Sequence, residues 1–211
     1  MNNWKNLIYF SSVFCLLIFI LIKQFQIEEK LKNTNQIIFN KSKKEQIKNL
    51  IKEDQKDIIL GNKTSNNTLV IYLRYGCPNC EDYYFKSIKK LLNNKSTELQ
   101  PKIILRFIGE PSRLKRFKFS VGAYKANECK ILEEYLDLLF NQDIELNAIK
   151  SFLDEKNCGL DDLHFSNFVN NKYQESREVG ITATPTTFLN GKRFVGVIPT
   201  EKLIKLLSEI H

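Results

Sequence analysis

The 211-residue chain has little of several residue types that characterise specialised proteins: 5 cysteines, 5 prolines, 8 glycines and 2 histidines. Five cysteines are too few for a disulfide scaffold, and so little proline and glycine excludes collagen-like and other fibrous chains. Hydrophobic residues make up 43% of the chain and charged residues 27%, which excludes wholesale disorder. The composition therefore indicates one packed domain with appendages, and it leaves redox chemistry open for the few cysteines.

The excess of basic residues is evenly spread. The chain has 32 basic and 24 acidic residues, a formal charge of +8. Residues 1–60 hold ten lysines and six acidic residues, so half of the excess precedes residue 61. Residues 113–119 interleave basic and aromatic side chains, a pattern found in nucleic-acid binding, but no recognised binding fold accompanies it and a solvated helix face explains it better. We therefore expect no nucleic-acid partner.

Residues 7–22 form an uncharged, apolar run near the start of the sequence. Its sixteen residues are slightly fewer than the roughly 20 that typically span a bilayer, although Trp4 stands where an interfacial anchor would. No small-residue cleavage site follows the run. We predict a transmembrane signal anchor over residues 1–25, with Cys15 as a small apolar residue inside it. A cleaved signal peptide and a buried core helix are the alternatives, and lysines on both sides leave the orientation open.

The remaining sequence alternates between strand and helix signals. Residues 26–57 are polar and lysine-rich with patches of helical periodicity, and predict a tether. Asn190-Gly191 between two hydrophobic runs is a strong hairpin signal. The expected elements are a strand at 68–74, a helix at 81–93, a strand at 102–108, a helical block at 112–179, a hairpin at 186–197 and a closing amphipathic helix.

Cys77 and Cys80 form a Cys-x-x-Cys motif at a predicted strand-to-helix junction. Pro78 takes the first helical position, where its missing N–H costs no hydrogen bond. The helix N-terminus would lower the pKa of Cys77, and Cys80, one turn deeper, could resolve a mixed disulfide. Zinc ligation and a buried structural pair are the alternatives. The chain has no second such motif, and the remaining candidate ligands Cys129, Cys158 and His164 lie in the helical block, so we expect a redox pair and no metal. His211 is the last residue of the sequence and is not expected to be a ligand.

The motif and its surroundings resemble the thioredoxin superfamily, and within it the exported branch of the disulfide-bond-formation protein A family. The resemblance covers about residues 58–211 and rests on Cys77-Pro78-Asn79-Cys80, the lead-in at 59–62, the helical block and the segment 180–191 with its Thr-Pro-Thr. It implies an α/β, thioredoxin-like fold in which a helical subdomain, about 110–180, is inserted between the second and third core strands. The transmembrane helix would precede this domain.

The resemblance also implies an activity and its setting. The protein would be a membrane-anchored protein-disulfide oxidoreductase on the periplasmic side of a bacterial cytoplasmic membrane, with no cofactor beyond the Cys77–Cys80 disulfide. Its partners would be exported proteins with thiols and a quinone-linked membrane protein that reoxidises the pair. Pro185 would be cis and face the cysteines, and Thr184 would present backbone groups to a substrate strand. A plain trans proline at the start of a strand is the alternative for Pro185.

Two departures from the family pattern bear on the direction of electron flow. Ile71 stands at the position nearest to a buried acid of many relatives, and Asn79 cannot supply the positive charge of a histidine. We therefore expect a weaker oxidant, with Arg74 as partial compensation if it faces the site. A thiol reductase of the same fold, for example one serving cytochrome maturation, is an alternative. A non-catalytic, tethered peptide-binding or chaperone module is another.

The resemblance admits a second, non-catalytic disulfide in the helical block. Cys129 and Cys158 are the remaining cysteines there, and both fall at predicted helix breaks. Two free thiols would be liabilities in an exported domain, so pairing is the expectation. Two independent buried cysteines, each acting as a small apolar residue, are the alternative.

Overall fold

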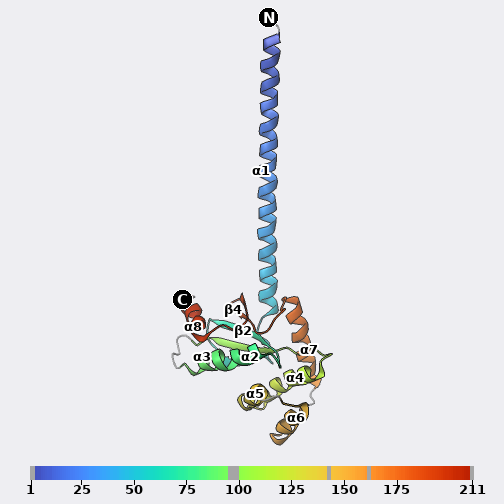
Figure 1. Ribbon diagram of the computed structural model, residues 1–211, viewed down its shortest axis with the longest axis vertical. Helices are drawn as coiled ribbons and strands as arrows, with labels where there is room; N and C mark the ends of the chain where they lie inside the picture. Colours follow the sequence, from blue (N-terminus) through green and yellow to red (C-terminus); the bar gives the residue numbers. More distant parts are fainter. Residues whose placement is uncertain (1–2, 95–99, 142–143, 161–162, 210–211) are drawn as a thin grey trace. The chain divides into compact units, whose positions relative to one another are not determined.

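The structure is a computed structural model that describes residues 3–94, 100–141, 144–160 and 163–209 (Figure 1). The chain divides into two units, residues 1–49 and residues 50–211. Helix α1 (Asn3–Leu50) runs through the first unit as 48 continuous residues, where the sequence predicted an anchor followed by a partly helical tether. The chain has no glycine or proline before Gly61, so no residue interrupts the helical hydrogen bonds.

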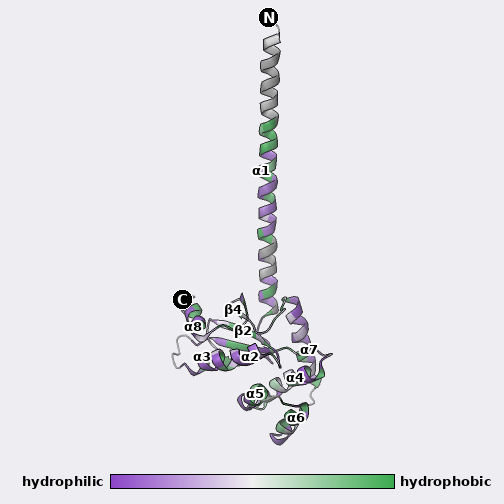
Figure 2. Ribbon diagram, viewed as in Figure 1, coloured by the Kyte–Doolittle hydropathy of each residue, from purple (hydrophilic) through white to green (hydrophobic). Residues whose placement is uncertain are grey.

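The transmembrane helix predicted within residues 1–25 is not found. Among the residues that the structure describes, no helix combines the length and the apolar character needed to cross a membrane. Figure 2 shows a hydrophobic band in α1 at residues 18–22, whose side chains are exposed, and mostly hydrophilic turns after it. The uncharged run ends at Lys23. The side chains of residues 1–17, including Trp4 and Cys15, lie outside the described residues.

A mixed five-stranded sheet organises the second unit, with the strand order β1-β3-β2-β4-β5. The central strands β2 and β3 are parallel, and every other neighbouring pair is antiparallel. Both central strands bury all but their first side chain, which accounts for their mainly hydrophobic sequences, with Arg106 of β3 as the exception. The strands are β1 (Ile58–Gly61), β2 (Thr68–Leu73), β3 (Lys102–Phe107), β4 (Thr186–Leu189) and β5 (Lys192–Val195).

Helices follow each central strand. A π-helical turn, η1, links the two short helices after β2, and the Lys86 carbonyl within it accepts a hydrogen bond of 3.0 Å from Thr200 Oγ1. In the described part of the chain, four helices lie between β3 and β4, where the sequence predicted a helical block at 112–179. The helices are α2 (Pro78–Tyr83), η1 (Tyr84–Ile88), α3 (Lys89–Asn93), α4 (Leu114–Glu128), α5 (Leu132–Asn141), α6 (Leu146–Glu155), α7 (Leu163–Glu178) and α8 (Thr200–Ser208).

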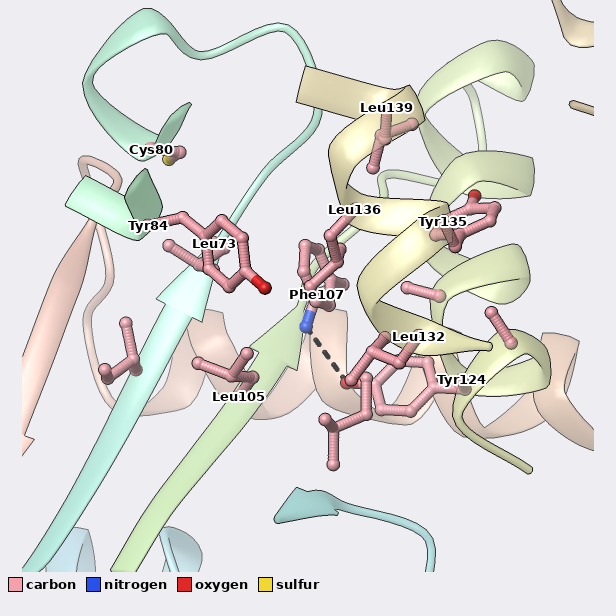
Figure 3. Close-up of a cluster of buried hydrophobic side chains, with 14 of the residues drawn as sticks. Leu73, Cys80, Tyr84, Leu105, Phe107, Tyr124, Leu132, Tyr135, Leu136 and Leu139 are labelled. Carbon is pink, nitrogen blue, oxygen red and sulfur yellow. Dashed lines mark hydrogen bonds between the residues drawn. The ribbon is translucent and has the colours of Figure 1, made fainter. Parts of the chain in front are cut away.

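The helices between β3 and β4 share one hydrophobic core with the sheet. Figure 3 shows strand residues such as Leu73 and Phe107 packed near leucines of α5. The backbone N–H of Phe107 donates to the Tyr124 hydroxyl of α4 at 3.0 Å, so a buried polar group at the end of β3 is satisfied. Cys80 belongs to the same core and is 0% exposed. The inner cysteine therefore lies in an apolar, water-excluded environment.

A buried arginine connects several elements on the sheet. Arg106 of β3 is 0% exposed, and its Nε and Nη2 donate to the carboxylate of Asp57 at 3.0 and 2.7 Å. Its Nη1 donates to Glu175 of α7 at 2.7 Å and to the Tyr72 hydroxyl of β2 at 3.0 Å. A buried charge is tolerated only with such full pairing. The cluster Arg106–Asp57–Glu175–Tyr72 fixes α7 and the segment before β1 against the central strands.

Candidate active site

Cys77 lies at the point where the chain leaves β2 and enters α2. It is the N-cap of α2, with extended backbone angles (φ −115°, ψ 104°), and Pro78 begins the helix as predicted. The Cys77 carbonyl accepts the N–H of Cys80 at 2.8 Å and that of Glu81 at 3.3 Å. This turn holds the outer cysteine, which is half-buried, at the surface and directs the inner one into the core.

Thr184, 107 residues further along the chain, faces the outer cysteine from the loop before β4. The Sγ atom of Cys77 lies 3.2 Å from the Thr184 carbonyl oxygen and 3.4 Å from its hydroxyl. The two contacts suit different protonation states: a thiol donates to the carbonyl, whereas a thiolate accepts from the hydroxyl. The peptide bond between Thr184 and Pro185 is cis. The structure thus brings all four residues predicted for the thiol site into one place.

The two thiols have opposite acidities. The pKa of Cys77 is lowered to about 5, mainly by its hydrogen bond with the Cys80 thiol, against the opposing effect of burial. The Thr184 hydrogen bond, the Cys80 backbone and the positive charge of Arg74 lower it further. The pKa of Cys80 is raised, first because its proton is held in the hydrogen bond with Cys77 and then by burial. The first proton of this coupled pair leaves Cys77, which is therefore the thiolate at neutral pH.

The position of Ile71, at which the family resemblance implied a buried acid, is apolar. Ile71 is buried and pairs with Thr187 of β4. The Thr187 hydroxyl lies 3.0 Å from the hydroxyl of Tyr83, which is on α2 three residues beyond Cys80. Burial raises the pKa of Tyr83 to about 12, so this pair stays neutral. No sequence pattern predicts this pair, because a strand threonine and a helix tyrosine far apart in the chain form no motif.

The other candidate residues lie away from the thiol pair. Cys129, the C-cap of α4, forms a disulfide with Cys158, which follows α6. His164 Nδ1 lies 3.5 Å from the Lys56 ammonium, and His211 is outside the described residues. Within the described part of the chain, no group of three or more histidine, cysteine or acidic side chains could hold a metal.

Comparison with known proteins agrees with this geometry. A family model described as thioredoxin matches residues 52–209. The chain belongs to the thioredoxin family. This confirms the resemblance inferred from the Cys-x-x-Cys motif and the Thr-Pro-Thr segment. No curated protein matches the chain.

Solved structures share the fold of this thioredoxin-family chain. The catalytic domain of Proteus mirabilis ScsC has a TM-score of 0.64 and 18% identity, over 80% of this chain and 96% of that one. The thiol-disulfide exchange protein alpha-DsbA2 from Wolbachia pipientis has a TM-score of 0.61 and 22% identity, over 84% and 98%. A periplasmic thioredoxin-like protein from Salmonella enterica serovar Typhimurium has a TM-score of 0.62 and 18% identity, over 77% and 94%. At these identities the likeness concerns the fold.

Proposed function

We propose that this protein is a thiol–disulfide oxidoreductase that introduces disulfides into exported proteins. The observation that carries the proposal is the acidity of the pair: Cys77 has a pKa of about 5 and lies beside the buried, protonated Cys80. A structural cysteine pair needs no stabilised thiolate, whereas an exchange enzyme does. Thr184, which precedes the cis peptide bond to Pro185, faces Cys77 from the opposite side of the site.

The proposed reaction moves two electrons from substrate to protein. A substrate thiolate attacks the sulfur of Cys77 in the oxidised pair, the Cys77–Cys80 bond breaks, and Cys80 leaves as a thiolate that takes up a proton. A second thiolate of the substrate then attacks the substrate sulfur of the mixed disulfide. Cys77 leaves as a thiolate, the substrate gains a disulfide, and the pair is left reduced. No further cofactor takes part in these steps.

The low pKa of Cys77 favours this direction over reduction. A stabilised Cys77 thiolate lowers the free energy of the reduced protein, which makes its disulfide a stronger oxidant, and it is also the better leaving group. A reductase would use the same residues with the opposite electron flow. A peptide-binding module without chemistry would not require an activated thiol. Arg74 contributes to the acidity, and this offsets part of what Asn79 cannot provide.

The setting of the reaction is part of the proposal. The Cys129–Cys158 disulfide supports an oxidising compartment such as the periplasm. Attachment to the cytoplasmic membrane through residues 7–22 rests on the sequence alone. A quinone-linked membrane partner that reoxidises the pair rests on the family resemblance. Export predicts that a tagged full-length protein becomes accessible to a membrane-impermeant thiol reagent in spheroplasts.

Single-turnover oxidation tests the proposed function. The oxidised full-length protein is mixed with a reduced peptide that carries two cysteines, and the products are trapped with acid and counted by mass spectrometry. We expect one peptide disulfide for each reduced Cys77–Cys80 pair. The Cys77→Ser variant should be inactive. Cys80→Ser, first activated as a mixed disulfide at Cys77, should hold a peptide with a single cysteine covalently, because that peptide has no second thiolate to release it. A peptide that stays reduced with the wild-type protein would contradict the proposal.

A further inference from the structure

A basic pocket of about 400 Å³ adjoins the thiol site. The start of α4, the end of α7 and the loop 180–184 form its walls. Its charged residues are Arg74, Arg113, Arg116, Arg177 and Glu110. Four guanidinium groups and one carboxylate in a single concavity make a strongly positive site, which the even distribution of charge along the sequence does not suggest.

Most of this positive charge has no acidic partner among the residues that the structure describes. Glu110 pairs with Arg113, its carboxylate 2.9 Å from Nε. In the described part of the chain, no carboxylate pairs with Arg74, Arg116 or Arg177. A guanidinium group presents several N–H donors in one plane, which matches the two oxygens of a carboxylate. The pocket is therefore suited to an anion with planar oxygen acceptors.

The pocket shares residues with the thiol site. Thr184 lines the pocket and contacts the Cys77 sulfur at 3.2 Å through its carbonyl. Arg74 also lines the pocket, and its charge lowers the pKa of Cys77. Thr182 and Ala183, exposed on the same loop, continue the wall away from the cysteine. A peptide whose cysteine reaches Cys77 would pass Thr184, so the residues next to that cysteine, each spanning roughly 3.3 Å when extended, would lie along this wall.

We propose that the arginine pocket binds an aspartate or glutamate side chain of the thiol substrate, close to the cysteine that reacts. This inference rests on the proposed function and adds a substrate class to it: proteins with acidic residues beside their cysteines. The apolar side chains of Ile108 and Ile181, which also line the pocket, suit the methylene groups of such a side chain. Oxidation of acidic segments would then be faster than oxidation of neutral ones.

Two matched peptides test the inference. Each carries the same two cysteines, one with aspartate and glutamate at the flanking positions and the other with asparagine and glutamine. With the oxidised full-length protein at low salt, we expect the acidic peptide to react about tenfold faster. In the double variant Arg116→Gln/Arg177→Gln the ratio of the two rates should fall close to one. The variant Lys90→Gln/Lys202→Gln, which removes two exposed positive charges on α3 and α8, should keep the ratio.

The outcomes separate this inference from the proposed function. Equal rates for the two peptides with the wild-type protein, or a preference that survives in Arg116→Gln/Arg177→Gln, would overturn the arginine pocket while the oxidation itself stands. If Lys90→Gln/Lys202→Gln lost the preference for the acidic peptide to the same extent, the preference would come from the overall charge of the protein. That result would also overturn the inference. A wild-type protein that oxidises neither peptide would instead contradict the proposed function. Raising the salt concentration to about 1 M should reduce the wild-type ratio, which gives a test that needs no variant.

Discussion

The acidity of Cys77 is produced by a few neighbours. The Cys80 thiol donates to it, the Thr184 hydroxyl is within reach, and Arg74 adds a positive charge. The folded pKa of about 5 is below the value of roughly 8.5 in an unfolded chain. The thiolate therefore stabilises the reduced folded protein fully above the unfolded pKa. This contribution is lost as the pH falls through about 5.

Selective alkylation tests this acidity. In the reduced protein, the rate of iodoacetamide labelling at Cys77 should follow a titration with a midpoint near pH 5, because the thiolate is the reactive form. Cys80 should stay unlabelled at pH 6, since its pKa is raised and it is buried. Peptide mass spectrometry measures both sites in one sample. Equal labelling of the two cysteines at pH 6, or a preference for Cys80, would contradict the assignment.

Thr184→Val removes a donor from the thiolate while keeping the shape of the side chain. We expect the pKa of Cys77 to rise by about half a unit to one unit, because a hydrogen bond to a charged group contributes roughly 1.5–3 kcal/mol before screening at this half-buried sulfur. Thiolate absorbance against pH measures the change. Thr182→Val, which alters an exposed threonine on the same loop, is the control and should leave the pKa of Cys77 unchanged. An unchanged titration in Thr184→Val would show that the hydroxyl does not act on the thiolate.

The elements that carry the site could be predicted from sequence because their signals are local. The hydrophobic runs at 68–73 and 102–107 and the Asn190-Gly191 turn correspond to β2, β3 and the β4–β5 hairpin. Strand β1 was missed because four residues at the edge of a sheet give no clear alternation. The continuous α1 was missed because the change from apolar to polar residues suggested a boundary that the backbone does not have.

The disulfide between Cys129 and Cys158 acts at the scale of elements, because it ties the end of α4 to the segment after α6. The bridged residues are 29 apart, and closing such a loop restricts the unfolded chain by roughly 3–4 kcal/mol. Cys129→Ala/Cys158→Ala should lower the free energy of unfolding by about this amount in urea titrations. Cys77→Ala/Cys80→Ala, which keeps the bridge, is the control. A loss below about 1 kcal/mol would show that the bridge does not restrain the unfolded chain.

The Arg106 cluster connects segments from across the domain, and no sequence motif predicts it. Its members come from the segment before β1, from both central strands and from α7, so only the fold brings them together. The sequence predicts a strand at 102–108, and nothing in it indicates which residues would pair with Arg106. The structure buries this arginine completely and supplies two carboxylates. The positive pocket was missed for the same reason, because its arginines come from separate segments.

Arg106→Met should destabilise the domain by about 3–5 kcal/mol, because it leaves the buried Asp57 carboxylate without its cation. Urea unfolding monitored by fluorescence measures the loss. Lys102→Gln is the control on the same strand: its partner Glu53 is exposed, and such a pair contributes about 1 kcal/mol or less. Equal effects of the two substitutions would contradict the structural role assigned to the cluster.

The reduction potential of the Cys77–Cys80 pair tests the central claim most directly, since it decides whether the activated thiol belongs to an oxidant. The full-length protein is equilibrated with mixtures of reduced and oxidised glutathione, quenched with acid, and the reduced fraction of the pair is read by mass spectrometry. Because the Cys77 thiolate stabilises the reduced form, we predict a potential clearly less negative than the roughly −270 mV of thioredoxin. A potential at or below that value would contradict the oxidising role.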